Sequence, residues 1–302
     1  MSLFKIISPK ALAEKLQQEA TRRIVAVDST WYLPYLQKNA KKEFMELERL
    51  PNAVFFDIDG VKDANSPYPH MLPDAATFNA SMSELGIRKN DILVVYDRVG
   101  NFSAPRCAWT LAVFGHELVY LLNNFPAYKA EGFPLDTTPR TSFSELEPSD
   151  YKSDADFTKQ EVVSYEEIHK LVEDGKLAEV YNVFDARALP RFTGESSEPR
   201  PEIPSGHIPG AQPMPFTDVV KNGIFEMDSR LAAENLEKYL ESSGCKYDPS
   251  KPTVAMCGTG VSGVIIKTAL ESAGIKHVKL YDGSWTEWAL RSEPKYVAKG
   301  RS

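Results

Sequence analysis

The sequence predicts an α/β protein made of two tandem domains, each with a mainly parallel sheet flanked by helices. Three observations support this prediction. The chain has 302 residues, which suits two domains of about 150 residues each. Short apolar runs alternate with segments of helical periodicity, as in parallel sheets that are covered on both faces. The pattern of the first half recurs in the second half at an offset of about 158 residues, a spacing that indicates duplicated domains.

In the first half, four apolar runs are expected to form buried strands. The first run, Ile24–Asp28, ends in an aspartate, and a helical pattern covers Ser103–Phe114. The other expected strands of this half are Asn52–Phe56, Asp91–Asp97 and Glu117–Leu122.

The second half repeats these runs in the same order. Its first strand, Tyr181–Asp185, also ends in an aspartate, and helical patterns cover Ala232–Leu240 and Val264–Leu270. The other expected strands of this half are Gly210–Met214, Pro252–Cys257 and His277–Asp282.

A polar stretch with several prolines separates the two halves and is typical of a linker. It begins near Pro134 and continues to about Lys159. We therefore expect an N-terminal domain at residues 1–135, a linker at 136–159 and a C-terminal domain at 160–302.

Composition argues against several classes of function. The formal net charge is −7 and the isoelectric point is near 5.4, which disfavours a surface for nucleic acid or for anionic membranes. Three cysteines do not make a disulfide framework and fit a reducing compartment. The N-terminus lacks the charged start and apolar run of a signal peptide, and no apolar run approaches the about 18 residues of a membrane span. We expect a soluble protein of the cytoplasm, with mitochondria left open, and no cofactor or metal.

The segment Cys257–Gly263 points most directly to chemistry. It lies between a buried strand and a helix, and it contains three glycines. These glycines let successive backbone N–H groups turn toward one point, and the helix N-terminus adds partial positive charge there. A cysteine in such surroundings is a thiolate near neutral pH, so Cys257 is interpreted as a nucleophile. The alternative, a small buried apolar residue, would not require three glycines at the start of a helix.

The duplication makes this interpretation sharper. The residue that follows the corresponding strand of the first half is Asp97, so only one of the two loops carries a thiol. This asymmetry fits one active and one inactive domain, although a structural cysteine could show the same pattern.

The motifs of the chain resemble those of the two-domain rhodanese superfamily, from about residue 5 to residue 292. The resemblance is closest to the 3-mercaptopyruvate sulfurtransferases, whose loop Cys-Gly-Ser/Thr-Gly-Val-Thr/Ser is matched by Cys257–Ser262. Thiosulfate sulfurtransferases instead carry basic residues at the two positions after the cysteine, where this chain has Gly258 and Thr259. The other matching motifs are Ser66–Pro73, Gly206–Ala211 and Asp282–Trp285.

The resemblance implies two tandem rhodanese-like domains and a persulfide relay. The Cys257 thiolate would attack the sulfur of 3-mercaptopyruvate, and pyruvate would leave as an enolate that must be protonated. An acceptor thiol, such as thioredoxin or a small-molecule thiol, would then take the sulfur.

The resemblance also assigns the substrate-binding groups. A 2-oxo acid carries a carboxylate, which the planar guanidinium of an arginine can bind with two hydrogen bonds. The alternative for the two arginines of the motif is that they pair with Glu195, Glu198 or Glu202 on a solvated loop. The implied substrate-binding residues are Arg191, Arg200, Gly258, Gly260, Val261 and Ser262.

A second set of residues is implied for proton transfer. In this family a relay is proposed in which Asp59 orients His70, and His70 draws the proton of Thr259. The alternative is that His70 caps a turn in its proline-rich segment while Thr259 only lines the loop.

Three neighbouring residues are expected to have structural roles or are left open. Arg187 is expected to form a salt bridge with Asp185, and His207 to fix the turn before the next strand. Trp285 belongs either to the wall of a pocket or to the core.

Three rival functions are weighed. The first rival, a cysteine-dependent phosphatase, needs an arginine after five intervening residues to bind phosphate, and Gly263 stands at that position. The second rival is a thiosulfate sulfurtransferase. Because thiosulfate is a dianion, it would favour a cationic loop, whereas the cysteine here is followed by the neutral Gly258 and Thr259. A non-catalytic sulfur carrier or interaction module would not need an intact cysteine loop together with Arg191 and Arg200.

Overall fold

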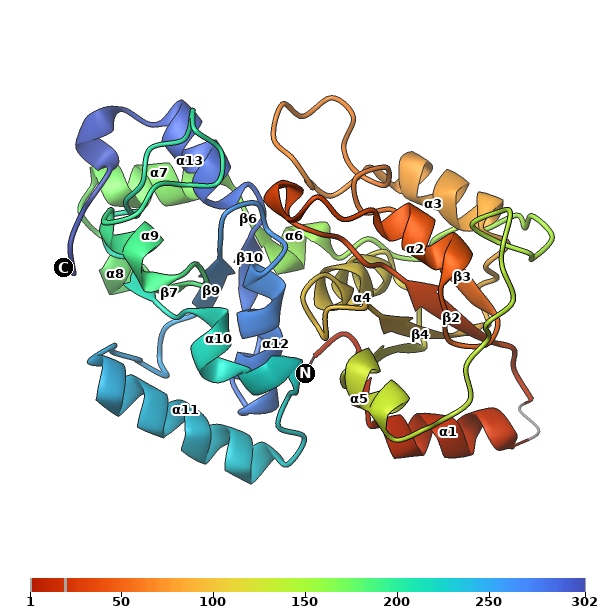
Figure 1. The fold of residues 1–302 in the computed structure, drawn as a ribbon. Helices are drawn as coiled ribbons and strands as arrows, with labels where there is room; N and C mark the ends of the chain where they lie inside the picture. The colour runs from red at the N-terminus through yellow and green to blue at the C-terminus, as the bar shows by residue number, and fades with distance from the viewer. Residues whose placement is uncertain (1, 19–20, 302) are drawn as a thin grey trace. The chain divides into compact units, whose positions relative to one another are not determined.

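The computed structural model describes residues 2–18 and 21–301. The chain divides into two compact units. The first unit contains Leu3–Asn65 and Leu72–Phe157, and the second contains the chain from Thr158 onward together with the short segment Ser66–Met71. Each unit is built on one five-stranded sheet flanked by helices (Figure 1). The predicted α/β fold is therefore confirmed.

In the first unit all of the pairings within the described sheet are parallel, and the strand order is β1-β5-β4-β2-β3. Strand β2 has the bounds that the sequence predicts, whereas the short edge strand β1 was not anticipated. The elements of this unit are β1 (Lys5–Ile7), α1 (Pro9–Gln17), β2 (Ile24–Asp28), η1 (Pro34–Leu36), α2 (Ala40–Glu46), β3 (Ala53–Phe55), α3 (Ala75–Glu84), β4 (Ile92–Tyr96), α4 (Ala104–Val113), β5 (Val119–Leu122) and α5 (Phe125–Ala130).

The second unit has a parallel sheet of order β6-β10-β9-β7-β8, so its strands follow one another as in the first unit. The elements are α6 (Thr158–Glu161), β6 (Val162–Val163), α7 (Tyr165–Glu173), α8 (Leu177–Val180), β7 (Asn182–Asp185), α9 (Leu189–Thr193), β8 (Gln212–Pro213), α10 (Phe216–Val219), η2 (Lys221–Gly223), α11 (Ser229–Ser243), β9 (Thr253–Met256), α12 (Gly263–Ser272), β10 (Lys279–Tyr281), α13 (Ser284–Arg291) and η3 (Pro294–Tyr296).

Helices cover both faces of each sheet. In the second unit α7 and α13 lie on one face, and α10, α11 and α12 lie on the other (Figure 1). In the first unit α1, α2 and α5 contribute to one core cluster with β2, β3 and β4. The central strands β4 and β9 are buried along their whole length, because a parallel sheet with helices on both sides has no face in contact with water.

Sheet register places the loops after the central strands next to an aspartate. Asp28 of β2 is paired with Tyr96 at the end of β4, and Asp185 of β7 is paired with Met256 at the end of β9. Ligands of open parallel sheets bind beyond the carboxyl ends of the strands. Each unit therefore brings a buried aspartate beside the loop that follows its central strand.

Residues in the range where a linker is expected pack against the first unit. The buried Arg49 donates hydrogen bonds to Asp136 and to the Thr138 carbonyl, and Phe143 contacts the rings of Phe44 and Phe55. Since these contacts continue to Phe157, whose N–H donates to the Val113 carbonyl, this stretch is irregular but ordered by packing.

Candidate active site

Cys257 directly follows β9 and is 1% exposed. Its loop turns sharply into α12, and two glycines make this turn possible. Gly260 has a φ of +78°, in the left-handed region that favours glycine. A Cβ on Gly263 would lie 3.0 Å from Leu280 Cδ1 and 3.2 Å from the carbonyl carbon of Met256, so a larger residue could not start the helix this close to β9.

The start of α13 holds the other side of this loop. The Cys257 N–H donates to Ser284 Oγ at 3.1 Å, and the Trp285 N–H donates to the Cys257 carbonyl at 2.9 Å. Ser284 Oγ in turn donates to the Tyr281 carbonyl at 2.8 Å. Both backbone polar groups of Cys257 are therefore fixed by the Asp282–Trp285 motif.

The segment Ser66–Met71 brings His70 to the Cys257 loop. His70 Nδ1 lies 3.0 Å from Thr259 Oγ1, and both residues are buried. His70 has a φ of +64°, a strained conformation for a residue with a side chain. The structure thus brings together three of the residues expected in the site, Cys257, Thr259 and His70.

A buried cluster of two arginines and two carboxylates lies beside the loop. Arg187 Nη2 donates to Asp185 Oδ2 at 2.6 Å, which confirms the expected salt bridge, and Nη1 donates to Glu198 Oε1 at 2.9 Å. Burial alone would lower the pKa of Arg187, but Asp185 and Glu198 together raise it above its usual value. Arg187 also lies over the ring of Trp285 at 4.5 Å.

Arg191 reaches the Cys257 loop from this cluster. Its Nε and Nη2 donate to the two carboxylate oxygens of Glu198, at 3.2 and 2.5 Å. A Cβ on Gly258 would lie 3.3 Å from Arg191 Nη2, so the guanidinium occupies space that a side chain at position 258 would need. Arg191 is paired with Glu198, as in the alternative weighed above, but the pair is partly buried rather than solvated.

For two of the expected site residues, the contacts described do not include the Cys257 loop. Arg200 is half-buried, and within residues 2–18 and 21–301 no hydrogen bond or ion pair of its guanidinium is seen. Asp59 belongs to the first unit, where its Oδ2 accepts a hydrogen bond from Trp31 Nε1 at 2.9 Å.

Two further residues of the motifs have structural surroundings. His207 Nδ1 lies 3.0 Å from the Phe192 carbonyl, its ring stacks on that of Phe192, and burial lowers its pKa. Trp285 is part of the core of the second unit, and its Nε1 donates to the Pro204 carbonyl at 2.8 Å.

The corresponding loop of the first unit is occupied by its own carboxylate. Asp97 Oδ1 accepts hydrogen bonds from the N–H groups of Val99 and Gly100 at 3.0 and 2.8 Å. Oδ2 accepts from Ser103 and Ala104 at 2.8 and 2.7 Å. Four backbone N–H groups of one loop therefore converge on one anionic side chain.

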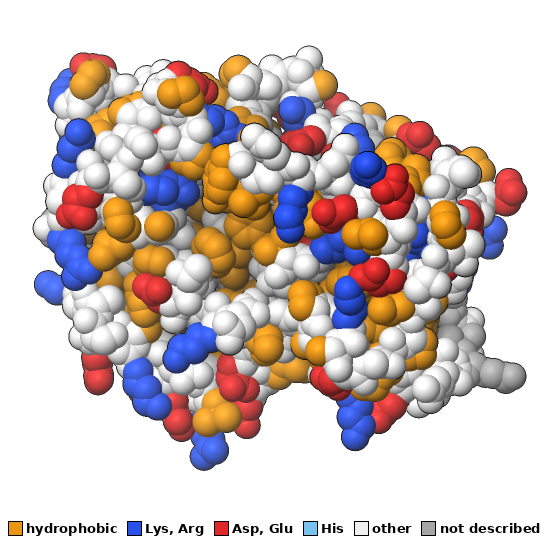
Figure 2. Space-filling view, viewed as in Figure 1, with side chains coloured by type: hydrophobic (Ala, Val, Ile, Leu, Met, Phe, Trp, Pro, Cys, Tyr) orange, Lys and Arg blue, Asp and Glu red, His pale blue; other side chains and the backbone are white. Residues whose placement is uncertain are grey.

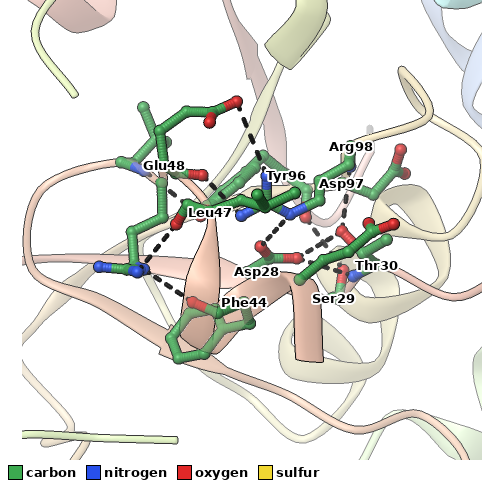
Figure 3. Close-up of polar contacts among 12 residues, drawn as sticks. Asp28, Ser29, Thr30, Phe44, Leu47, Glu48, Tyr96, Asp97 and Arg98 are labelled. Atoms are coloured by element: carbon green, nitrogen blue, oxygen red, sulfur yellow. Dashed lines mark hydrogen bonds and ion pairs between the residues drawn. The ribbon is translucent and has the colours of Figure 1, made fainter. Parts of the chain in front are cut away.

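The first unit also has an arginine beside its buried aspartate, although the sequence Asp28-Ser29-Thr30 lacks one. It comes from Arg98, which follows Asp97 (Figure 3). Arg98 Nε lies 3.6 Å from Asp28 Oδ2, and Nη2 donates to the Glu48 carbonyl at 2.6 Å. Burial raises the pKa of Asp28, against the lowering effect of Arg98 and Thr30.

Sequence reasoning missed two contributors. Glu198 was weighed only as a competitor for the arginines, and Ser284 entered only as part of the motif Asp282–Trp285. No local signal marks Glu198, because its role depends on Arg187 and Arg191 folding back onto it. Ser284 has a φ of +52°, which sequence does not reveal for a serine.

A cavity of about 830 Å³ lies in the same unit, but it is not the site of the cysteine. It lies among α10, α11 and α12, and none of residues 257–262 lines it. Within the described part of the chain, no helix is long and apolar enough to cross a bilayer. On the face shown in Figure 2, basic and acidic side chains are interspersed.

Comparisons with known proteins identify the family. The model of the rhodanese-like domain matches residues 164–291. A protein of Saccharomyces cerevisiae named thiosulfate sulfurtransferase Tum1 is 52% identical over the full length of both chains. A probable 3-mercaptopyruvate sulfurtransferase of Schizosaccharomyces pombe is 42% identical, with 95% of this chain and 93% of that protein covered.

Solved structures agree with these relatives. The crystal structure of Tum1 from Saccharomyces cerevisiae has a TM-score of 0.96 at 52% identity and covers 100% of both chains. A sub-stoichiometric sulfur transferase subunit of yeast mitochondrial complex I has a TM-score of 0.82 at 39% identity and covers 98% of this chain and 100% of that one. The chain is therefore a sulfur-transferring enzyme and belongs to the family of two-domain rhodanese-like sulfurtransferases, which includes the 3-mercaptopyruvate sulfurtransferases.

Proposed function

We propose that this enzyme takes sulfur from 3-mercaptopyruvate, holds it as a persulfide on Cys257 and passes it to a thiol acceptor. The observation that carries this proposal is the combination of a cysteine loop without basic residues and an arginine, Arg191, placed next to Gly258. Such a site offers planar hydrogen-bond donors to a carboxylate rather than a cationic loop to an inorganic dianion.

In the first half-reaction the Cys257 thiolate attacks the substrate sulfur. A sulfur–sulfur bond forms, the carbon–sulfur bond breaks, and its electron pair moves onto carbon to give the enolate of pyruvate. The enolate takes a proton and leaves as pyruvate. The hydrogen-bonded pair of His70 and Thr259, 3.0 Å apart, is proposed to deliver that proton, because a hydroxyl linked to an imidazole can pass it on.

In the second half-reaction an acceptor thiolate attacks the outer sulfur of the persulfide. Cys257 leaves as a thiolate, and the acceptor carries the persulfide away. Thioredoxin or a small-molecule thiol is the proposed acceptor. The family resemblance assigns Asp59 the orienting of His70 and assigns Arg200 a second contact to the substrate, and both assignments remain proposals.

The proposal can fail at each of its parts. Purified protein should release pyruvate from 3-mercaptopyruvate when a thiol acceptor is present, and Cys257→Ser should abolish this release. Intact-mass measurement after substrate without acceptor should show one added sulfur on the wild type and none on Cys257→Ser. An Arg191→Ala/Arg200→Ala variant with an unchanged KM for 3-mercaptopyruvate would contradict the carboxylate-binding role.

Thiosulfate is the second candidate donor, because the relative at 52% identity is named a thiosulfate sulfurtransferase. The loop 258–263 contains no basic residue to balance a dianion. We therefore expect thiosulfate to be the poorer donor. A higher kcat/KM with thiosulfate and cyanide than with 3-mercaptopyruvate and a thiol would reverse this choice.

We propose the cytoplasm as the compartment, with mitochondria as the second one. The mitochondrial alternative is supported by the matching structure, which is described as a subunit of mitochondrial complex I. Fractionation of cells that carry a C-terminally tagged chain would distinguish the two.

A further inference from the structure

The guanidinium of Arg191 is held along one edge only. Nε and Nη2 both donate to the carboxylate of Glu198. Within the described residues, no hydrogen bond of Nη1 is seen. A guanidinium can bind a second carboxylate along the edge formed by Nη1 and Nη2. Glu198 therefore does not occupy the Nη1–Nη2 edge of Arg191, to which a substrate carboxylate could bind.

Glu198 is itself locked in place. Its side chain is 4% exposed, and Oε1 accepts hydrogen bonds from both Arg187 Nη1 and Arg191 Nε. Arg187 is fixed in turn by Asp185 and by the Gly206 carbonyl, to which Nη2 donates at 2.8 Å. Rotation of Glu198 away from Arg191 would leave a buried arginine short of a partner, which is costly.

Gly258 gives this guanidinium its place beside the reactive loop. The distance of 3.3 Å between an added Cβ and Arg191 Nη2 is already tight, so a longer side chain at position 258 would displace the guanidinium. A neutral glycine after the cysteine and an arginine from α9 are therefore two parts of one arrangement.

The cluster carries no net charge, since its two arginines are balanced by Asp185 and Glu198. Arg191 consequently offers directed donors with much of its positive charge compensated. A single carboxylate can use these donors, whereas the second negative charge of a dianion would lie near Glu198 without a counter-charge.

We propose that Glu198 is a positioning and specificity-determining residue. It orients Arg191 toward the space beside Gly258 and lowers the affinity of the site for dianions, so that a monoanionic 2-oxo acid thiol is preferred over thiosulfate. This inference rests on the proposed role of Arg191 in substrate binding.

Glu198→Gln tests both effects, because it removes the negative charge at nearly the same shape. The KM for 3-mercaptopyruvate should rise about five- to tenfold with little change in kcat, and kcat/KM for thiosulfate should rise about threefold or more. The matched control is Glu202→Gln, which removes the same charge from an exposed side chain of the same loop. That variant should change neither the KM for 3-mercaptopyruvate nor kcat/KM for thiosulfate.

Glu198→Asp separates the orienting effect of Glu198 from the effect of its charge. This variant also tests the inference if Glu198→Gln does not fold. It keeps the charge but shortens the side chain. The KM for 3-mercaptopyruvate should therefore rise about as much as in Glu198→Gln, while kcat/KM for thiosulfate should not rise.

The double variant Arg191→Ala/Glu198→Gln shows whether Glu198 acts through Arg191. The glutamine change should have no further effect on the KM for 3-mercaptopyruvate once Arg191 is absent. The inference would be overturned if Glu198→Gln changed kcat/KM by the same factor with both donors. It would also be overturned if the glutamine change had its full effect on the KM for 3-mercaptopyruvate in the Arg191→Ala background. If Arg191→Ala alone leaves that KM unchanged, the proposed function has failed instead.

Discussion

In the first unit the loop after β4 is closed around the carboxylate of Asp97, whereas in the second unit the loop after β9 begins with the thiol of Cys257. Both loops follow the central strand of a sheet with the same strand order, and both lead into a buried helix. The first loop supplies four backbone N–H groups to its own anion. The geometry of the first loop therefore suits a negative charge, and the proposed persulfide of Cys257 would place one at the equivalent position of the second loop.

In both units the aspartate beside the loop is paired with an arginine, but this arginine comes from a different part of the sequence in each unit. In the second unit Arg187 follows Asp185 by two residues and bonds it at 2.6 Å. In the first unit Arg98 comes from the loop itself and lies 3.6 Å from Asp28. Arg98 occupies the position equivalent to Gly258, so in the first unit the arginine belongs to the loop itself, whereas in the second unit Arg191 reaches the loop from α9.

The largest effect is expected for Cys257→Asp, which gives the second loop the residue of the first. Sulfur transfer should fall by at least about 10³-fold, because a carboxylate cannot carry sulfane sulfur. The melting temperature should equal or exceed that of Cys257→Ser, because the carboxylate can accept the loop N–H groups as Asp97 does. Pyruvate release and thermal unfolding by circular dichroism are the measurements.

Removal of the carboxylate from the first loop provides the control for that experiment. Asp97→Ala should destabilise the first unit by about 2–4 kcal/mol, since four backbone N–H groups, three of them in buried hydrogen bonds, lose their acceptor. If instead Cys257→Asp melts well below Cys257→Ser, the two loops do not share an anion-binding geometry.

A smaller effect is expected for the stability of variants that lack Arg187 or Arg98. Arg187→Ala should lower the free energy of unfolding by about 3–5 kcal/mol, because it leaves the buried Asp185 without its paired arginine and removes one of the two arginines bound to Glu198. Arg98→Ala should cost less, about 1–3 kcal/mol, because its ion pair with Asp28 is longer. Denaturant titration of both variants measures this difference, and equal losses would show that the two pairs are energetically equivalent despite their geometry.

The smallest expected effect is a loss of stability at acidic pH. His116 in the first unit and His207 in the second are buried, and burial lowers the pKa of both. The folded protein therefore keeps these side chains neutral, while the unfolded chain binds a proton below about pH 6.5. Stability should be complete above that pH and should decline as pH falls, by at most about 1.4 kcal/mol per pH unit for each histidine.

Thermal unfolding of His116→Gln and His207→Gln between pH 5 and 8 measures this dependence. Each variant should lose part of the acid sensitivity of the wild type. An unchanged slope in both variants would assign the acid sensitivity to other groups.

Sequence was sufficient for much of the fold because the inner strands β2, β4, β7 and β9 are largely buried and so stand out as apolar runs. Strand β2 and the aspartates that end β2 and β7 were located correctly. The edge strands β1 and β6 were missed, since three and two residues are too short for a periodic signal. The expected helix Ala232–Leu240 is part of a longer one, α11, that begins at the Asp228 cap.

The sequence by itself determined the α/β class, the duplication and the cysteine loop, because these are carried by residues that lie next to one another along the chain. Only the tertiary structure decided that His70 of the first repeat reaches Thr259, that Arg98 takes the part of an absent arginine, and that Glu198 holds Arg191 beside Gly258. Those contacts join residues that are distant in sequence or that fold back within an irregular loop, and no local pattern encodes them.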